Sequence, residues 1–335
     1  MHPIHREMAD SVGADVQTVY RREELPDYFN GSVLSDLLYS TSEIEPEYDV
    51  FVFEHACTLY TLPRLVGKIG NATVLFLHST AKFGGAEVYP LPEWPLPLRV
   101  AGKTHQTLDA ALLKRLIGRY VDGVITVSEY FARRCSKWYD GLITVARPFI
   151  RSPKLGELDD AAVAIESKRA VYLGTDRGYK GLDLLIDAWS AVRKSHPSAE
   201  LYLYGDGHSS RYGRREGVSV MGYADTLTEA FTGAGVFVHP AKLDAHPIAP
   251  IEAMYAGLPA IVTGATGSKR AISQVSDDLI VSPRTADQLA ETISCYFDLP
   301  RDAKERLSNA SRTTAERYTE AIRKREFPSA VTAHL

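Results

Sequence analysis

The sequence predicts an α/β protein made of two domains, each a doubly wound, Rossmann-like parallel sheet. Three observations favour this fold class. Short apolar runs, such as residues 236–240 (VFVHP) and 259–264 (PAIVTG), are typical of buried parallel strands. These runs alternate with stretches that predict helices, which is the pattern of βαβ units. The chain has 335 residues, enough for two domains of ordinary size.

Composition narrows the class of protein. Hydrophobic residues make up 45% and charged residues 24% of the chain, as in ordinary soluble globular proteins. The formal net charge of −4 argues against nucleic-acid binding through bulk charge. Cys57, Cys135 and Cys295 are widely spaced and odd in number, so neither a disulfide framework nor a metal site is expected. No apolar run reaches membrane-spanning length and no signal peptide is recognised, so we expect a cytoplasmic protein that would meet the inner membrane surface only from outside the bilayer.

The first domain is expected over residues 1–150, and its start is unusual. A doubly wound domain normally begins with a strand and a Gly-rich turn, whereas residues 2–13 predict a helix. The first strand of this domain is therefore expected to be missing, by truncation or by native reduction. The other expected elements are strand 14–20, helix 33–40, strand 48–55, helix 61–70, strand 72–80, loop 81–98, helix 108–121, strand 122–129, helix 131–139 and strand 141–150.

Two places in this domain carry candidate functional residues. The strand 72–80 ends in the polar triplet His78, Ser79 and Thr80, at the edge of the sheet where ligands bind in such folds. A lone histidine there is more often structural, and the residue pattern by itself favours that interpretation. The helix 131–139 carries basic side chains and Trp138, which would suit an anionic membrane surface but equally a core helix with a solvated face.

A linker is expected over residues 151–167, the second domain over 168–310, and a C-terminal helix over 311–335. The expected elements are strand 168–176, loop and helix 177–197, strand and turn 199–207, strand and loop 217–225, helix 226–235, strand 236–240, helix 250–256, strand 259–264, strand, turn and helix 277–297, and a charged helix pair 302–319.

The stretch 241–267 is the central feature of the second domain. It joins the strand 236–240 to a helix that begins at Pro250, so residues 241–251 form the ligand-binding edge of the sheet. The unpaired N–H groups at this helix N-terminus, around Ile248 and Ala249, suit a phosphate or diphosphate. Gly267 would let further backbone N–H groups approach it.

Asp244 and Glu252 lie beside this anion site, with seven residues between them. Carboxylates are poor phosphate ligands but good acceptors for sugar hydroxyls, so the implied ligand is a nucleotide-sugar. The alternative is that Glu252 only complements the helix dipole and Asp244 is a solvated loop residue. Residues 177–197 are a loop followed by a helix, and Lys180 lies just before that helix. It likewise indicates either a phosphate ligand or a solvated lysine.

The same stretch resembles the E-x(7)-E region of family 4 glycosyltransferases, which belong to the glycosyl transferases group 1 and have the GT-B fold. The match combines the acid spacing, the EAM-x-x-G-x-P helix in residues 252–259 and the flanking strands; it departs at the first acid, which is Asp244 here. The resemblance is good over residues 168–320 and looser over 48–150.

The family motif G-R-x(4)-K-G corresponds to residues 174–181. Lys180 matches its lysine, but Thr175 stands where the arginine is expected, and Arg177 is the candidate substitute. Losing the arginine is not neutral, because a guanidinium binds phosphate in two directions at once. His78 matches a family histidine that contacts the donor sugar from the opposite domain.

The resemblance implies two domains facing a cleft, with the last helix returning to the first domain. It implies a retaining enzyme that moves a hexose-type sugar from a UDP- or GDP-sugar to a glycan, lipid-linked or protein-linked acceptor, without a cofactor or divalent metal. Lys180, Arg177, the helix N-terminus and the Gly267 region would stabilise the leaving diphosphate. Glu252 would accept hydrogen bonds from the ribose hydroxyls, and Asp244 and His78 would hold the transferred sugar.

Two alternatives stay open at this point. The departures at Asp244 and Thr175, together with the missing strand, are compatible with a non-catalytic relative that binds a nucleotide or a partner. A nucleotide-sugar epimerase would act on the donor without an acceptor, and the EAM-x-x-G-x-P helix fits it less well.

Overall fold

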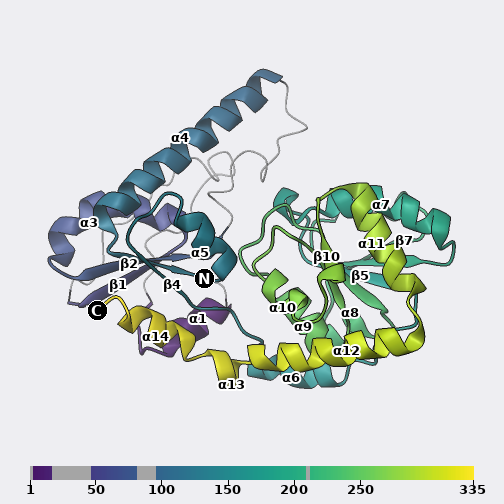
Figure 1. Cartoon of the computed structure of the whole chain (residues 1–335). Coiled ribbons are helices and arrows are strands. Elements are labelled where there is room, and N and C mark those ends of the chain that lie inside the picture. The colour runs from purple at the N-terminus through teal and green to yellow at the C-terminus, as the bar shows by residue number, and fades with distance from the viewer. Residues whose placement is uncertain (1–2, 17–46, 81–95, 209–211) are drawn as a thin grey trace. The chain divides into compact units, whose positions relative to one another are not determined.

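A computed structural model of the chain describes residues 3–16, 47–80, 96–208 and 212–335. The chain divides into two compact units (Figure 1). Unit 1 consists of Met1–Arg147 and Lys324–Leu335, and unit 2 consists of Pro148–Arg323. The last residues of the chain thus belong to the same unit as the first.

Unit 1 is built on a parallel sheet whose strands follow one another in sequence order, β1-β2-β3-β4. The strands are β1 (Val50–Glu54), β2 (Thr73–His78), β3 (Gly123–Thr126) and β4 (Leu142–Val145). Every β3 residue and all but the first of β2 are buried, because helices cover both faces of a parallel sheet. In the described residues the strand order does not reverse, so the double winding expected for this domain is not seen there.

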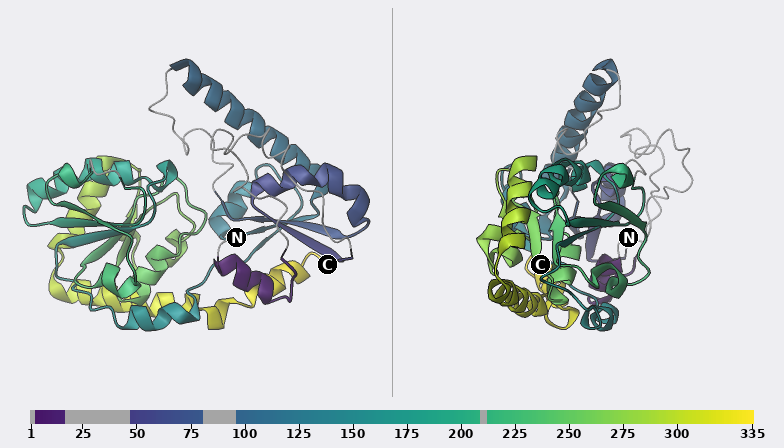
Figure 2. Two further views of the ribbon diagram at one scale, coloured as in Figure 1. Left: turned by 180° about the vertical axis from the view of Figure 1, so that it is seen from behind. Right: turned by 90° about the vertical axis from the view of Figure 1, so that its right-hand side faces the viewer.

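The one-directional order explains the placement of the helices of unit 1. Right-handed crossovers between strands that advance in one direction put their helices on one face of the sheet. Figures 1 and 2 show α3 and α4 on one face and α1 and α14 on the other. Ile4 and Met8 of α1 and Phe327 of α14 are buried there. The helices are α1 (Pro3–Asp10), α3 (Leu62–Ile69), α4 (Leu96–Tyr120), α5 (Glu129–Cys135) and α14 (Glu326–Thr332).

Some expectations for this domain differ from the structure or lie outside the described residues. α4 begins twelve residues before the expected start of its helix, because Pro97 is only its second residue, where a missing N–H costs no intrahelical hydrogen bond. Residues 14–16 form no strand. Residues 17–20, the helix expected at 33–40 and most of the loop expected at 81–98 lie outside the described residues. Among the described helices, none has both the length and the apolar character needed to cross a bilayer.

Unit 2 has a six-stranded parallel sheet with the order β10-β9-β8-β5-β6-β7. The strands are β5 (Arg169–Leu173), β6 (Glu200–Tyr204), β7 (Val218–Gly222), β8 (Val236–His239), β9 (Ala260–Thr263) and β10 (Ile280–Val281). Ala170 of β5 pairs with Leu201 on one side and with Val236 on the other. The order therefore reverses between β5 and β8, as expected of a doubly wound sheet, and ligands of such sheets bind at this point.

Helices cover both faces of this sheet, and Trp189, Phe231 and Phe237 are fully buried in the core between the layers. The helices are α6 (Ser152–Asp159), α7 (Leu182–Ser195), α8 (Leu227–Phe231), α9 (Ala249–Tyr255), α10 (Lys269–Ser273), α11 (Ala286–Asp298), α12 (Arg301–Ala315) and α13 (Glu320–Arg323).

Residues 151–167, expected as a linker, contain the helix α6, which is part of the fold of unit 2. Leu158 is buried, and the Glu157 carboxylate accepts a hydrogen bond of 2.8 Å from the N–H of Leu227 at the start of α8. Polar composition concealed this helix, because only one of its side chains is fully buried. The charged helix pair expected over 302–319 is a single helix, α12, followed by a short 3-10 turn.

Candidate functional site

Two loops meet at the point where the strand order of unit 2 reverses. One follows β5 and leads through the 3-10 turn Gly178–Lys180 into α7, and the other follows β8 and leads into α9. The N–H of Lys242 donates a 2.8 Å hydrogen bond to the carbonyl of Tyr179, which joins the loops. Gly181 has a φ of 73°, and a Cβ there would lie 2.2 Å from the carbonyl oxygen of Pro240. Only glycine permits this approach of the two backbones.

The joined loops bring together three polar side chains from different parts of the sequence. The Nζ atom of Lys180 lies 2.5 Å from Oδ2 of Asp244, and Nε2 of His239 lies 3.2 Å from the same oxygen. Asp244 and His239 are buried, and the side chain of Lys180 is 19% exposed. Two of the predicted site residues, Lys180 and Asp244, are therefore in direct contact.

The charges of this cluster are mutually stabilised. Burial alone would raise the pKa of Asp244, but the Lys180 ammonium and the His239 hydrogen bond outweigh it and hold that pKa well below its usual range. Burial opposes the charge of Lys180, but Asp244 raises its pKa above the ordinary value. Burial lowers the pKa of His239, with Asp244 opposing it in part. At neutral pH the cluster is an ammonium, a carboxylate and a neutral imidazole.

Arg177 adds a second positive charge at the same loop. Its side chain is exposed, and no hydrogen bond or ion pair involves it among the described residues. Its charge acts on Lys180, whose pKa it lowers slightly against the effect of Asp244. Thr175 is exposed, and its carbonyl accepts the N–H of Arg177. The loop thus offers an anionic ligand one half-buried and one exposed cation.

Glu252 lies in the first turn of α9 and is half-buried. Within the described part of the chain, its carboxylate has no hydrogen-bond or ion-pair partner. Burial raises the pKa of Glu252 to about 7, with Lys154 of α6 lowering it and Glu157 raising it by smaller amounts. A carboxylate without a partner, held at a ligand-binding edge, is suited to accept hydroxyl groups of a ligand.

The backbone groups predicted to bind phosphate differ from one another in the structure. The N–H groups of Ile248 and Ala249 have no acceptor among the described residues, as expected at a helix start. The N–H of Gly267, by contrast, donates a 3.0 Å hydrogen bond to the carbonyl of Asp244. The Gly267 N–H is thus already bonded within the protein, and the approach of backbone N–H groups around Gly267 to a phosphate stays a prediction. The hydrogen bond from Gly267 links the loop after β9 to Asp244, whose own N–H donates to the carbonyl of Ala265.

His78 is the last residue of β2 in unit 1, as predicted, but its ring is buried among aromatic side chains. It stacks on Phe76 at 5.4 Å, lies 5.2 Å from the Phe131 ring, and meets Trp138 edge-on. Burial, and secondarily Arg134, lowers the pKa of His78 to about 3. The ring is therefore neutral at physiological pH, and its surroundings are those of a structural histidine.

Sequence reasoning missed His239 and Lys242. His239 ends the strand β8, so the rule that selected His78, a polar residue at the carboxyl end of a parallel strand, would also have selected it. Lys242 pairs with Asp183 of α7 at 3.0 Å, and no local pattern in the sequence predicts this contact between the loops.

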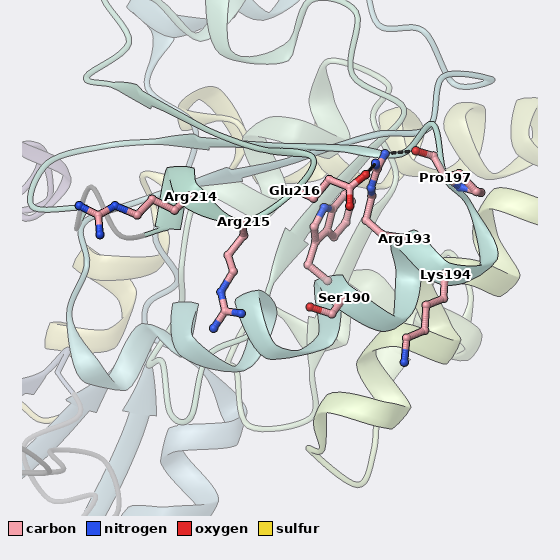
Figure 3. A pocket seen from close by; sticks show the side chains of 8 residues that line it. Ser190, Arg193, Lys194, Pro197, Arg214, Arg215 and Glu216 are labelled. Carbon is pink, nitrogen blue, oxygen red and sulfur yellow. Dashed lines mark hydrogen bonds and ion pairs between the residues drawn. The ribbon is translucent and has the colours of Figure 1, made fainter.

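A separate pocket lies at the other end of α7 (Figure 3). It is lined by Trp189, Ser190, Arg193, Lys194, Pro197, Arg214, Arg215 and Glu216. The Arg193 guanidinium in its wall is held by Glu216 and by the carbonyl of Pro197. Because α7 starts at the carboxyl ends of the strands and runs back along the sheet, this pocket lies at the opposite edge from Lys180.

Among the described residues, no group of three or more His, Cys, Asp or Glu side chains has an arrangement that could hold a metal ion.

Known proteins share sequence similarity with unit 2. Residues 167–298 match the model of the family Glycosyl transferases group 1. Mannosylfructose-phosphate synthase of Agrobacterium fabrum is 29% identical over 150 residues, which cover 39% of this chain and 33% of that protein. The lipopolysaccharide glucosyltransferase WaaG of Escherichia coli is 27% identical over 130 residues, which cover 36% of this chain and 35% of that protein. The matched part spans less than half the length of each of these relatives.

Solved structures show the same fold at low sequence identity. Sucrose-phosphate synthase of Thermosynechococcus elongatus superimposes with a TM-score of 0.64 at 16% identity, over 85% of this chain and 73% of that one. HepE of Anabaena, solved in complex with UDP-glucose, superimposes with a TM-score of 0.64 at 14% identity, over 96% of this chain and 86% of that one. The predicted GT-B fold is thereby confirmed. Residues 167–298 are thus similar to the group 1 glycosyl transferases, on a chain that has the GT-B fold.

Proposed function

We propose that the protein is a glycosyltransferase that moves a hexose-type sugar from a nucleotide-sugar to a glycan, lipid-linked or protein-linked acceptor, with retention of the anomeric configuration. One observation carries the proposal: Lys180 contacts Asp244 where the strand order reverses in a sheet that matches the group 1 family, and the same two connections carry Arg177 and Glu252. That family transfers glycosyl groups, and the four side chains supply the two kinds of contact that a nucleotide-sugar needs.

The two cations stabilise the negative charge that develops on the leaving diphosphate. Preorganised positive groups in a partly buried site stabilise such charge more strongly than water does. Lys180 and Arg177 supply these charges, and the N–H groups of Ile248 and Ala249 add donors. Their number matches a diphosphate better than a single phosphate.

The two carboxylates accept hydrogen bonds from hydroxyl groups of the donor. Glu252 accepts from the ribose, and the Oδ1 atom of Asp244, which has no partner among the described residues, accepts from the transferred sugar. The contact between His78 and the sugar stays a prediction from the resemblance. With a neutral ring, His78 would act as a hydrogen-bond partner and not as an acid.

The donor class is best sought first among uridine nucleotides. HepE has been solved with UDP and glucose, and TarM of Staphylococcus aureus with UDP. These are statements about those proteins, and they make UDP-sugars the first candidates here, with GDP-sugars second.

A thermal-shift screen with UDP, GDP, UDP-glucose, UDP-N-acetylglucosamine and GDP-mannose tests the proposal. A ligand that binds only the folded state raises the melting temperature by mass action. We expect a shift with one nucleotide family that is lost in Glu252→Ala, followed by sugar release or transfer from the matching donor. A well-folded protein that shifts with none of them contradicts the proposal and favours a non-catalytic relative.

A membrane-bound acceptor is a finer part of the proposal. Arg133 and Lys137 are exposed near α5, and Leu108 of α4 is 65% exposed. Basic and apolar side chains of this kind bind anionic lipid surfaces. Sedimentation with vesicles of phosphatidylglycerol, compared with phosphatidylcholine alone, tests it, and Arg133→Glu with Lys137→Glu should abolish any difference.

A further inference from the structure

The carboxylate of Asp244 receives two partners on one oxygen. Lys180 and His239 both approach Oδ2, at 2.5 and 3.2 Å, and Oδ1 has no partner in the described residues. The side chain of His239 is buried, and its other ring nitrogen, Nδ1, has no hydrogen-bond partner among the described residues. The polar contact of the His239 ring is therefore made to Asp244.

The direction of this hydrogen bond follows from the charges. An ionised carboxylate only accepts hydrogen bonds, so the Nε2 atom of His239 must carry the proton and donate it. Lys180 supplies the positive charge of the cluster, and His239 supplies a neutral N–H. Asp244 thus has one partner that a ligand can attract away and one that it cannot.

A bound diphosphate would compete for the first partner. Lys180 has three N–H donors but a single charge, and a diphosphate at this loop draws that charge away from Asp244. Asp244 would then be a buried carboxylate beside a new anion. Leaving such a group without a compensating hydrogen bond is costly.

We propose that His239 is a positioning residue, which keeps the Asp244 carboxylate hydrogen-bonded and in place while the Lys180 ammonium turns from Asp244 to the diphosphate of the donor. This proposal rests on the proposed function and deepens it. Without His239, Asp244 has Lys180 as its only side-chain partner among the described residues, and each diphosphate that binds must break that pair.

A double-mutant cycle on nucleotide affinity tests this role. His239→Leu, Asp244→Asn and the double variant are titrated calorimetrically with UDP and with GDP, and with UMP and GMP as matched controls that lack the second phosphate. In His239→Leu we expect the diphosphate that binds the wild type to bind about tenfold more weakly, the factor for one hydrogen bond to a charged group. Monophosphate affinity should change little.

The second arm of the cycle separates positioning from packing. Asp244→Asn removes the charge that needs compensation, so His239→Leu should add no further loss of diphosphate affinity in that background. His239→Gln keeps an N–H donor and should retain most of the affinity. If His239→Leu does not fold, His239→Asn replaces it, because its shorter amide falls short of Asp244.

The outcomes are distinct. An equal loss from His239→Leu in the wild-type and Asp244→Asn backgrounds, or an equal loss for mono- and diphosphates, overturns the positioning role while leaving the donor site intact. A wild-type protein that binds neither diphosphate overturns the proposed function, and this proposal with it.

Discussion

Gly181 and the carbonyl of Pro240 hold the two site loops of unit 2 together by contact of backbone on backbone. A Cβ on Gly181 would lie 2.2 Å from that oxygen, and the φ of 73° is one that other residues rarely adopt. Neighbouring Lys180 is thereby fixed opposite Asp244, although the two are 64 positions apart in the sequence. The geometry of the charged cluster depends on a residue that carries no charge.

Gly181→Ala should therefore damage both the fold and the site. Relieving the clash must push the loops apart, and the positive φ adds strain, so we expect a loss of about 1–3 kcal/mol in the free energy of unfolding. Nucleoside-diphosphate binding should weaken as well. Gly156→Ala is the matched control: a Cβ there meets nothing within 4 Å in the helix α6, so that variant should be as stable as the wild type or slightly more so. Urea unfolding of both variants checks this, and equal stabilities would contradict the argument.

The second prediction concerns the arginine that is absent at position 175. Arg177 is exposed and close enough to Lys180 to lower its pKa, so we expect it to contact a bound diphosphate. Arg177→Ala should weaken UDP or GDP binding by about three- to tenfold, more at low salt than at high salt because an exposed charge is screened.

Thr175→Arg tests whether the two positions are interchangeable. Introduced into Arg177→Ala, it should restore diphosphate affinity, since a guanidinium at 175 would occupy the position that the family motif gives its arginine. Introduced into the wild type, it should add little. Calorimetric titration at two salt concentrations measures both effects, and an Arg177→Ala variant with unchanged affinity at low salt would show that Arg177 does not contact the ligand.

The parts of the site that lie in one local pattern could be predicted from the sequence. Asp244 and Glu252 belong to a single loop and helix, and Lys180 precedes a helix, so their spacing and the resemblance located them. The ion pair between Lys180 and Asp244 could not be predicted, because it depends on the pairing of β5 with β8, which no short motif specifies. His239 could have been selected as a polar residue at the end of a strand, but its contact with Asp244 could not, because the loop that returns to it sets that contact.

Errors in the fold have similar physical origins. The helix α6 went unrecognised because it buries only Leu158 and uses Glu157 to bond the start of α8. The acceptor of the Gly267 N–H could not be predicted, because glycine freedom is visible in a sequence, whereas the acceptor of a particular N–H is not. Strands were placed well because the buried parallel strands, such as β8 and β9, are continuous apolar runs.

Glu252 supplies a prediction about pH. Its pKa is raised to about 7 in the free protein, and ribose hydroxyls that donate to it favour the ionised form. Nucleotide binding should therefore release protons near pH 7, and affinity should fall as the pH decreases from 8 to 6. Calorimetry in buffers of different ionisation enthalpy measures the release. Glu252→Gln should bind more weakly and without this pH dependence, and a proton release that persists in this variant would assign it to another group.

The same carboxyl group affects the stability of the free protein. Its folded pKa lies above that of an unfolded glutamate, so the folded state binds the proton more tightly and loses stability as the pH rises from about 4.5 to about 7. Glu252→Gln should consequently melt at a higher temperature than the wild type at pH 8 and at a similar one at pH 4.5. A lower melting temperature at pH 8 would contradict the unpaired state of this carboxylate.

The contribution of His78 to stability depends on pH in the opposite direction to that of Glu252. Its pKa is lowered to about 3 by burial, below the ordinary value of about 6.5, so the folded state excludes a proton that the unfolded chain accepts. The contribution of this ring to stability is complete above pH 6.5 and is lost as the pH falls towards 3. His78→Phe keeps an aromatic ring beside Phe76 and Phe131 and removes the titrating group, so this variant should lose less stability than the wild type between pH 7 and pH 5. Urea unfolding at the two pH values, followed by circular dichroism, gives the comparison. The same slope in both proteins would mean that the ring is protonated without cost, and would contradict its neutral, buried state.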